Sequence, residues 1–135
     1  MKTTATYSPT KWDEKPYEQS STMKLTKASV EFAFHGQMEG HGLVEYLMFY
    51  SSYDDHDPHK AAARYVGLIR FKGELNGKTG SFVLEDRGMF EGGVANSSLT
   101  IIPGSGTDEL RGITGAGTYT ASQKSSRCDL TYELK

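Results

Sequence analysis

The distribution of glycine constrains this chain more than any other sequence feature. All 15 glycines follow residue 35, and from there they recur every few residues. Glycine and proline at such intervals divide a chain into short strands and turns instead of long helices. The intervening runs are rich in Thr, Val, Ile, Phe and Tyr, which favour β-strands. The best helical candidate, residues 59–64, is one or two turns at most.

The sequence predicts eight strands, near residues 3–9, 25–35, 41–52, 62–73, 79–88, 94–103, 115–122 and 128–135. Asn76-Gly77 is typical of a type I′ hairpin turn, because both residues tolerate a positive φ. Consecutive hairpins form an antiparallel meander, and a meander of this size usually closes because closure removes the exposed edges. We therefore expect an all-β protein, an eight-stranded antiparallel closed up-and-down β-barrel, as a single domain over residues 1–135.

Alternation along the strands assigns side chains to the two faces of the sheet. One parity is mostly apolar and is predicted to face the interior, which in an eight-stranded barrel is either filled or holds one small ligand. The residues of this face that we expect to line an apolar central cavity and bind a ligand are Phe34, Leu47, Phe49, Ile69, Phe71, Phe82, Leu84, Leu99 and Tyr132.

Three polar residues on the same parity are the candidate catalytic groups. Glu45 lies between Leu43 and Leu47, and a carboxyl in an apolar cavity has a raised pKa, which suits a general acid or base. A structural carboxylate bonded to a tyrosine or an arginine is the alternative. Asp86 is the reserve candidate, although its place near the predicted strand end favours a position at the rim. Tyr65 points inward and would orient Glu45 or a ligand, unless it only packs in the core.

The strands at 41–52 and 62–73 are apolar on their second face as well, and a strand that is apolar on both faces must be covered. The cover is either the N-terminal segment, through Trp12 and Tyr17, or another subunit. We expect a homo-oligomer through these two strands. The residues predicted to point outward are Val44, Tyr46, Met48, Tyr50, Val66, Leu68 and Val83.

Charge and cysteine content exclude several classes of function. The formal charge is 15 − 17 = −2, which argues against a nucleic-acid or anionic-membrane binder. No run approaches the length of a membrane span, and the first residues lead into no apolar segment, so we expect no signal peptide and a cytoplasmic protein. The single cysteine, Cys128, excludes a disulfide framework. The segment 53–59 holds two histidines and three aspartates, but its proline and consecutive charges favour a solvated loop, and we predict no metal and no cofactor.

Five segments occur in an order that resembles a known family: WDEKPY (12–17), VEYLM (44–48), YVGL (65–68), GSFVL (80–84) and PGSGTDEL (103–110). Together they resemble the bacterial DUF3224 family, small proteins with an allene-oxide-cyclase-like β-barrel. The resemblance implies an eight-stranded antiparallel barrel with a central cavity. Members of the wider superfamily, such as allene oxide cyclase, dirigent proteins and some polyketide cyclases, bind an apolar substrate in the barrel. Transfer of that chemistry to this chain is an analogy of fold.

Two positions differ from the family pattern. Ile69 stands where the family has Glu, and Asp86 stands where it often has His. Both lie on the predicted interior parity, so the polarity of the cavity differs from that of the family. A divergent natural member and an engineered pocket would both show these differences.

Three classes of function are compatible with this sequence. The first is a protein that holds a small apolar molecule in its central cavity. The second is an isomerase, cyclase or lyase-type enzyme that uses Glu45 as general acid or base. The third is a structural oligomer with a filled core. A hollow interior separates the first two classes from the third.

Overall fold

The described residues contain eight β-strands and the short 3₁₀ helix η2. This computed structural model describes residues 1–53, 57 and 60–135. The elements are β1 (Lys2–Gln19), β2 (Lys24–Gly36), β3 (Met38–Ser52), β4 (Ala62–Leu75), β5 (Lys78–Glu91), β6 (Val94–Ile101), η2 (Asp108–Leu110), β7 (Thr114–Ala121) and β8 (Ser126–Glu133). All eight predicted strands are present. No helix within the described ranges is long and apolar enough to cross a membrane.

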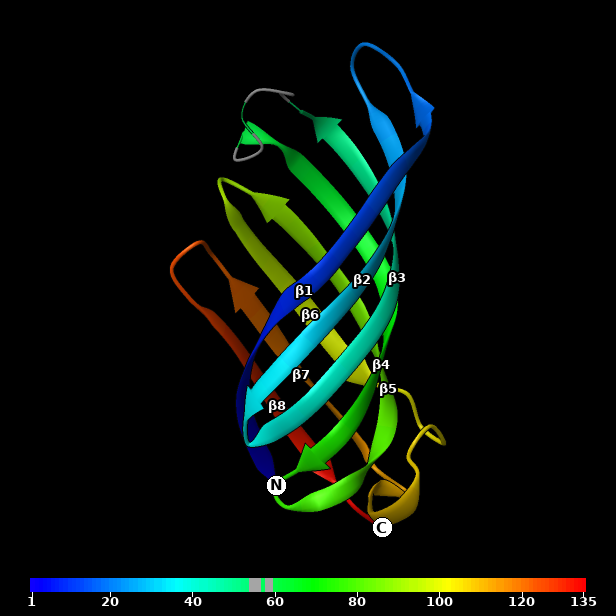
Figure 1. Ribbon diagram of the computed structural model, residues 1–135, viewed down its shortest axis with the longest axis vertical. Coiled ribbons are helices and arrows are strands. Elements are labelled where there is room, and N and C mark those ends of the chain that lie inside the picture. Colours follow the sequence, from blue (N-terminus) through cyan, green and yellow to red (C-terminus); the bar gives the residue numbers. More distant parts are fainter. Residues whose placement is uncertain (54–56, 58–59) are drawn as a thin grey trace.

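The strands form a ring in which each strand is antiparallel to its neighbours in the chain. The ring is completed by β1 and β8, which pair through Lys2–Ala5 and residues 128–131. The connections β1–β2, β5–β6 and β7–β8 lie at the upper end in Figure 1, which we call the hairpin end. Both chain termini lie at the opposite end, which we call the terminal end.

The turn between β4 and β5 has the geometry that its sequence predicts. Asn76 and Gly77 have φ angles of 49° and 84°. Two consecutive residues with positive φ are characteristic of a type I′ turn, whose twist matches that of the strands it joins. Leu75 pairs directly with Lys78 across this turn, so the register of the hairpin is set at its first residue pair.

The first strand is longer than predicted, because β1 continues to Gln19 instead of ending near residue 9. Beyond Ala5, β1 pairs with β2 and no longer with β8. A strand edge without a partner tolerates residues that lack an N–H donor. Pro9 and Pro16 both lie at shifts in the β1–β2 register, which explains why two prolines do not end this strand.

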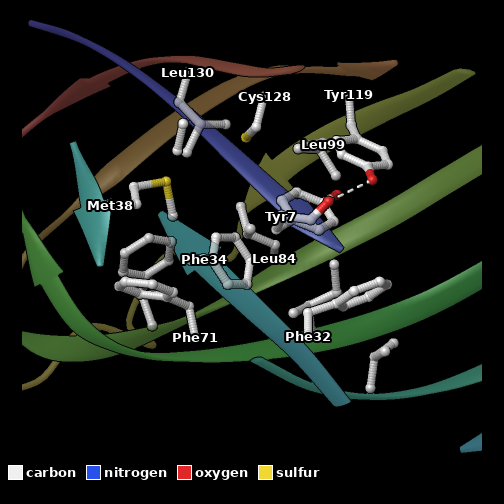
Figure 2. Close-up of a cluster of buried hydrophobic side chains, with 14 of the residues drawn as sticks. Tyr7, Phe32, Phe34, Met38, Phe71, Leu84, Leu99, Tyr119, Cys128 and Leu130 are labelled. Carbon is white, nitrogen blue, oxygen red and sulfur yellow. Dashed lines mark hydrogen bonds between the residues drawn. The ribbon is translucent and has the colours of Figure 1, made fainter. Parts of the chain in front are cut away.

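The half of the ring nearer the terminal end is filled with apolar side chains. Phe34, Phe71 and Phe82 come from three different strands and pack with ring centroids 5.0 and 5.2 Å apart. Met38, Leu75 and the η2 residue Leu110 are fully buried beside them. Figure 2 shows part of this cluster and places Tyr7 and Tyr119 on its side toward Phe32. The apolar central cavity that the sequence predicts does not extend into this half, which matches the filled-core alternative.

The predicted orientation of β3 is wrong. Val44, Tyr46 and Met48 are buried and point into the ring, whereas Leu47 is 52% exposed and points outward with Phe49. Both sets of alternate residues on this strand are apolar, so alternation alone does not show which set faces inward. A shift by one residue moves every side chain to the opposite face. The polar residues His41 and Glu45 fall on the outward set and are the sequence signal for the observed orientation.

An exposed apolar surface covers the outer side of β3, β4 and β5. We call it the outer apolar face; it consists of Leu43, Leu47, Phe49, Val66, Leu68 and Met89. The N-terminal segment does not cover it, since the Trp12 ring stacks on the inward-pointing Tyr46 at 6.5 Å and Tyr17 is exposed. That alternative of the sequence prediction is wrong. Association with another subunit through this face stays a prediction.

Candidate functional site

A pocket of about 480 Å³ occupies the half of the ring near the hairpin end. Its size lies in the range of small-molecule sites in proteins. Most of its wall is aromatic or small and apolar, with one acid and one lysine. The described residues that line it are Trp12, Lys24, Phe32, Tyr46, Met48, Tyr50, Tyr53, Ala61, Ala63, Tyr65, Asp86, Phe90, Ala95, Tyr119 and Ala121.

The stacked pair Tyr7 and Tyr119 separates this pocket from the filled half of the ring. Their ring centroids are 3.9 Å apart and nearly parallel. The Tyr119 hydroxyl donates a hydrogen bond of 2.8 Å to the backbone carbonyl of Tyr7, shown by the dashed line in Figure 2. Burial raises the pKa of Tyr119 to about 12, so its hydroxyl stays neutral and remains a donor. The Tyr119 ring, stacked on Tyr7, therefore forms an aromatic floor of the pocket.

The acid of the pocket is held by a tyrosine two strands away. Tyr46 on β3 pairs with Gly67 on β4, and Gly67 pairs with Asp86 on β5, so the three residues share one level of the sheet. Gly67 has no side chain, and a Cβ there would lie 2.6 Å from Cδ1 of the Tyr46 ring. The ring therefore crosses over Gly67, and its hydroxyl donates a hydrogen bond of 2.6 Å to Oδ2 of Asp86.

The same arrangement recurs one strand further around the ring. Tyr65 on β4 pairs with Gly88 on β5, which pairs with Ser97 on β6. The Tyr65 hydroxyl and Oγ of Ser97 are 2.7 Å apart, and a Cβ at Gly88 would lie 2.5 Å from that hydroxyl. Burial raises the pKa of Tyr65 to about 12. Two glycines thus allow two tyrosines to lie flat against the pocket wall.

Asp86 is the most unusual polar group of the site. It is only 1% exposed, and its second carboxyl oxygen, Oδ1, is buried without a hydrogen-bond partner among the described residues. Burial raises the pKa of this carboxyl, and hydrogen bonds to the carboxylate oppose the rise in part. The pKa of Tyr46 is also raised by burial and by the adjacent carboxyl, so Tyr46 remains a donor. A buried carboxyl with a free oxygen on a pocket wall can accept a hydrogen bond or take part in proton transfer.

A second carboxylate holds the rim of the pocket together. Oε2 of Glu14 accepts hydrogen bonds of 2.6 Å from both Thr26 and Tyr50, and Oε1 accepts one of 2.9 Å from the Trp12 indole. These contacts tie β1, β2 and β3 together at the hairpin end. All the partners are neutral donors, and both oxygens of Glu14 are occupied by them.

The structure places the three predicted catalytic residues in different environments. Glu45 is on the outside of the ring, where 59% of its side chain is exposed and it contacts Ser29 and Lys27. The prediction that Glu45 points into the interior is wrong, for the reason given for β3. Asp86 and Tyr65 both line the pocket. The predicted rim position of Asp86 is also wrong, because β5 continues to Glu91 and leaves Asp86 inside the strand.

The predicted ligand-binding residues do not line this pocket. Leu47 and Phe49 belong to the outer apolar face. The other seven lie in the packed core: Phe34, Ile69, Phe71, Phe82, Leu84, Leu99 and Tyr132. The Tyr132 hydroxyl accepts a hydrogen bond of 2.7 Å from the Asn76 side chain, so its polar atom is used in the fold.

Sequence reasoning missed most of the pocket wall. Tyr46, Met48 and Tyr50 were assigned to the outer surface through the wrong orientation of β3. Trp12 was missed because residues beyond 9 were not predicted to belong to a strand. An inward glycine beside an inward tyrosine on the next strand, as at Gly67, is the signal that would have pointed to a side chain lying across it.

The segment 53–59, weighed above as a metal site, lies mostly outside the described residues, which omit 54–56 and 58–59. Among the residues that are described, no group of three or more His, Cys, Asp or Glu side chains is arranged to hold a metal ion.

Comparison with known proteins agrees with this architecture. The chain is similar, with a TM-score of 0.76 and 23% identity, to the crystal structure of a protein with unknown function from the DUF3224 family from Shewanella oneidensis MR-1. The alignment covers 100% of this chain and 97% of that one, and at this identity it supports the fold alone. No protein with a curated description matches the sequence. The family model described as "Protein of unknown function (DUF3224)" matches residues 3–134, and the chain therefore belongs to the DUF3224 family.

Proposed function

We propose that this protein binds a small, mainly apolar molecule in the pocket at the hairpin end. In this proposal the ring is a closed β-barrel with two compartments, one filled and one that receives the ligand. The observation that carries it is the combination of an aromatic-lined pocket with a buried acid, Asp86, whose Oδ1 has no partner among the described residues. Sites for small molecules typically combine apolar walls with a few polar groups that fix orientation.

The pocket wall supports binding over a purely structural role. A filled interior would bring large side chains together across the ring, as Phe34, Phe71 and Phe82 do near the terminal end. Near the hairpin end the wall instead includes Ala63 and Ala121, and the tyrosines lie against the sheet. Small residues at these positions leave space that an apolar ligand would fill with favourable burial.

A pair of matched variants tests the proposal with the neutral fluorescent probe N-phenyl-1-naphthylamine. Ala63 faces the pocket, whereas its neighbour Ala62 is on the opposite face of β4. We expect the wild type and Ala62→Trp to bind the probe with enhanced fluorescence and Ala63→Trp to lose binding. Ala121→Phe provides a second blocked pocket, and circular dichroism verifies that each variant is folded. Equal binding by the blocked variants and the wild type would contradict the proposal.

Proton transfer is the second candidate, and the environment of Asp86 favours it. Desolvation raises the pKa of this carboxyl, and a carboxylate with a raised pKa is a stronger base than one in water. Its Oδ1 has no hydrogen-bond partner among the described residues, while Oδ2 accepts a hydrogen bond from Tyr46. An isomerase, cyclase or lyase-type reaction that begins with removal of a carbon-bound proton would use Asp86 in the role predicted for Glu45.

The activated substrate 5-nitrobenzisoxazole tests this chemistry. The base removes the proton from the ring carbon, the N–O bond breaks, and a coloured cyanophenolate leaves while the proton passes from Asp86 to water. We expect Asp86→Asn to lower the rate by about 100-fold or more. Asp129→Asn, on the outside of β8, is the matched control and should retain the rate. A rate unchanged in Asp86→Asn would exclude Asp86 as the base.

A further inference from the structure

We infer that the ligand of this pocket is an elongated apolar anion whose charged group lies at Lys24 and whose other end lies at Asp86. This inference rests on the proposed binding function and adds to it a chemical class and a direction. Lys24 is the only cation, and Asp86 the only acid, among the described residues that line the pocket. A wall with one positive and one acidic group distinguishes the two ends of a ligand.

Lys24 is positioned to receive an anion. It is the first residue of β2, and its Nζ lies 4.7 Å from the ring centroids of both Tyr50 and Tyr53. Contacts with two aromatic faces hold the ammonium group near one place without neutralising it. Within the described part of the chain Lys24 forms no salt bridge at 4.0 Å or less, and the rim carboxylate Glu14 is hydrogen-bonded to three neutral donors instead of to Lys24. A carboxylate or sulfonate at the rim would therefore meet an available charge.

The length of the ligand follows from the positions of the two groups along β3. Lys24 pairs with Tyr50, and the Tyr46 hydroxyl is bonded to Asp86. Tyr46 and Tyr50 are four residues apart, which corresponds to about 13 Å along a strand. Two linked aromatic rings with an acidic substituent approach this extent. The tyrosines and Trp12 along the way provide faces and edges on which flat rings pack well.

The direction of binding follows from charge. An anionic group placed beside Asp86 would be desolvated next to an acid and would lose its hydration without compensation. At that end a hydroxyl or another hydrogen-bond donor fits, because the free Oδ1 is an acceptor when the carboxyl is ionised. The charged end therefore stays at the rim, where Lys24 is half-buried and water completes its solvation.

The test compares biphenyl-4-carboxylate with its neutral counterpart biphenyl-4-carboxamide, each as a competitor that displaces N-phenyl-1-naphthylamine. We expect Lys24→Gln to lower the affinity for the carboxylate by about tenfold and to leave the affinity for the carboxamide unchanged. Lys24→Arg keeps the charge and should retain most of the affinity for the carboxylate. Lys27→Gln is the matched control on the same strand, since Lys27 lies outside the ring near Glu45. Added salt should weaken only the binding of the carboxylate, and only in proteins with a cation at position 24.

The outcomes separate the two proposals. If Lys24→Gln changes the affinities for both competitors equally, or changes neither, the proposal of an anionic ligand end at Lys24 is overturned. Binding of the neutral probe would in that case still support the pocket as a binding site. If Lys27→Gln weakens the carboxylate as much as Lys24→Gln does, the effect is that of overall charge and the assignment to Lys24 is overturned. If the neutral probe binds Ala63→Trp as well as the wild type, the proposed function itself fails.

Discussion

Replacement of Asp86 by Asn should change how the free energy of unfolding depends on pH. The direction of this change follows from the burial of Asp86. The pKa of Asp86 is raised from its ordinary value of 3.8, mainly by desolvation. The folded protein therefore holds this proton more tightly than the unfolded chain does. The stabilising contribution is fully present below pH 3.8 and is lost as pH rises through the folded pKa. Asp86→Asn removes this titration and should become more stable relative to the wild type as pH rises.

The magnitude follows from the titration of one proton, which sets how steeply the free energy of unfolding changes with pH. Between the unfolded and the folded pKa of Asp86, the difference in free energy of unfolding between Asp86→Asn and the wild type should grow by up to about 1.4 kcal/mol per pH unit. Below and above that window the difference should be flat. An Asn side chain also changes the hydrogen bonds to Tyr46 and leaves a buried amide group, which adds an offset of about 1–3 kcal/mol. This offset is independent of pH and does not alter the slope.

Urea unfolding followed by far-ultraviolet circular dichroism, repeated from pH 3 to pH 8, measures this difference. Asp129→Asn is a control of opposite sign, because Arg127 and Thr4 lower the pKa of the exposed Asp129 carboxyl. Its contribution is present above the ordinary pKa of 3.8 and is lost below it, so the control should vary only at the acidic end. A flat or falling difference for Asp86→Asn between pH 4 and pH 8 would refute a desolvated carboxyl in the pocket.

Three further predictions concern the wall, the core and the outer surface. Gly67→Ala should weaken binding of N-phenyl-1-naphthylamine in fluorescence titrations, because the new methyl group displaces the Tyr46 ring. Phe71→Ala should lower the free energy of unfolding in urea by about 3–5 kcal/mol, since it leaves a cavity in the packed half of the ring. If the outer apolar face joins two copies, light scattering should give a dimer mass for the wild type and a monomer mass for the double variant Leu47→Lys, Leu68→Lys. A monomeric wild type at high concentration would contradict that last prediction.

The sequence predicts the strands because their signals are local. Asn76-Gly77 fixes one hairpin through two positive φ angles, and the β-favouring runs between glycines coincide with the observed strands. The parity of β4, β5, β6 and β8 was predicted correctly. On β5, β6 and β8 one face is more apolar than the other, and on β4 the charged Arg64 and Arg70 mark the outward face. Ile69, Leu84, Leu99 and Tyr132 are accordingly buried.

The pocket was harder to predict because it depends on contacts between strands. On β3 both faces are apolar, and the sequence prediction places Glu45 inside and Tyr46 outside, opposite to the structure. The charge at Glu45 carries the correct signal, since a carboxylate on an inward face needs a partner and one on the outer face is solvated. Asp86 was placed on the correct face, but its depth depends on where β5 ends, which the local sequence leaves undefined.

Two glycines contribute to the division of the ring into a filled and a lined half. At the level of Phe71 the paired residue on β5 is Phe82, and the Phe34 ring lies over Gly42 on β3, so large side chains meet across the interior. At the levels of Gly67 and Gly88 the missing side chains let the neighbouring tyrosines lie along the wall, with their hydroxyls bonded to Asp86 and Ser97. The space that remains is bounded by aromatic faces. At that depth Asp86 lies against the pocket wall instead of in solvent. The pocket and an acid with a raised pKa therefore arise from the same packing, so a methyl group at either glycine should disturb both together.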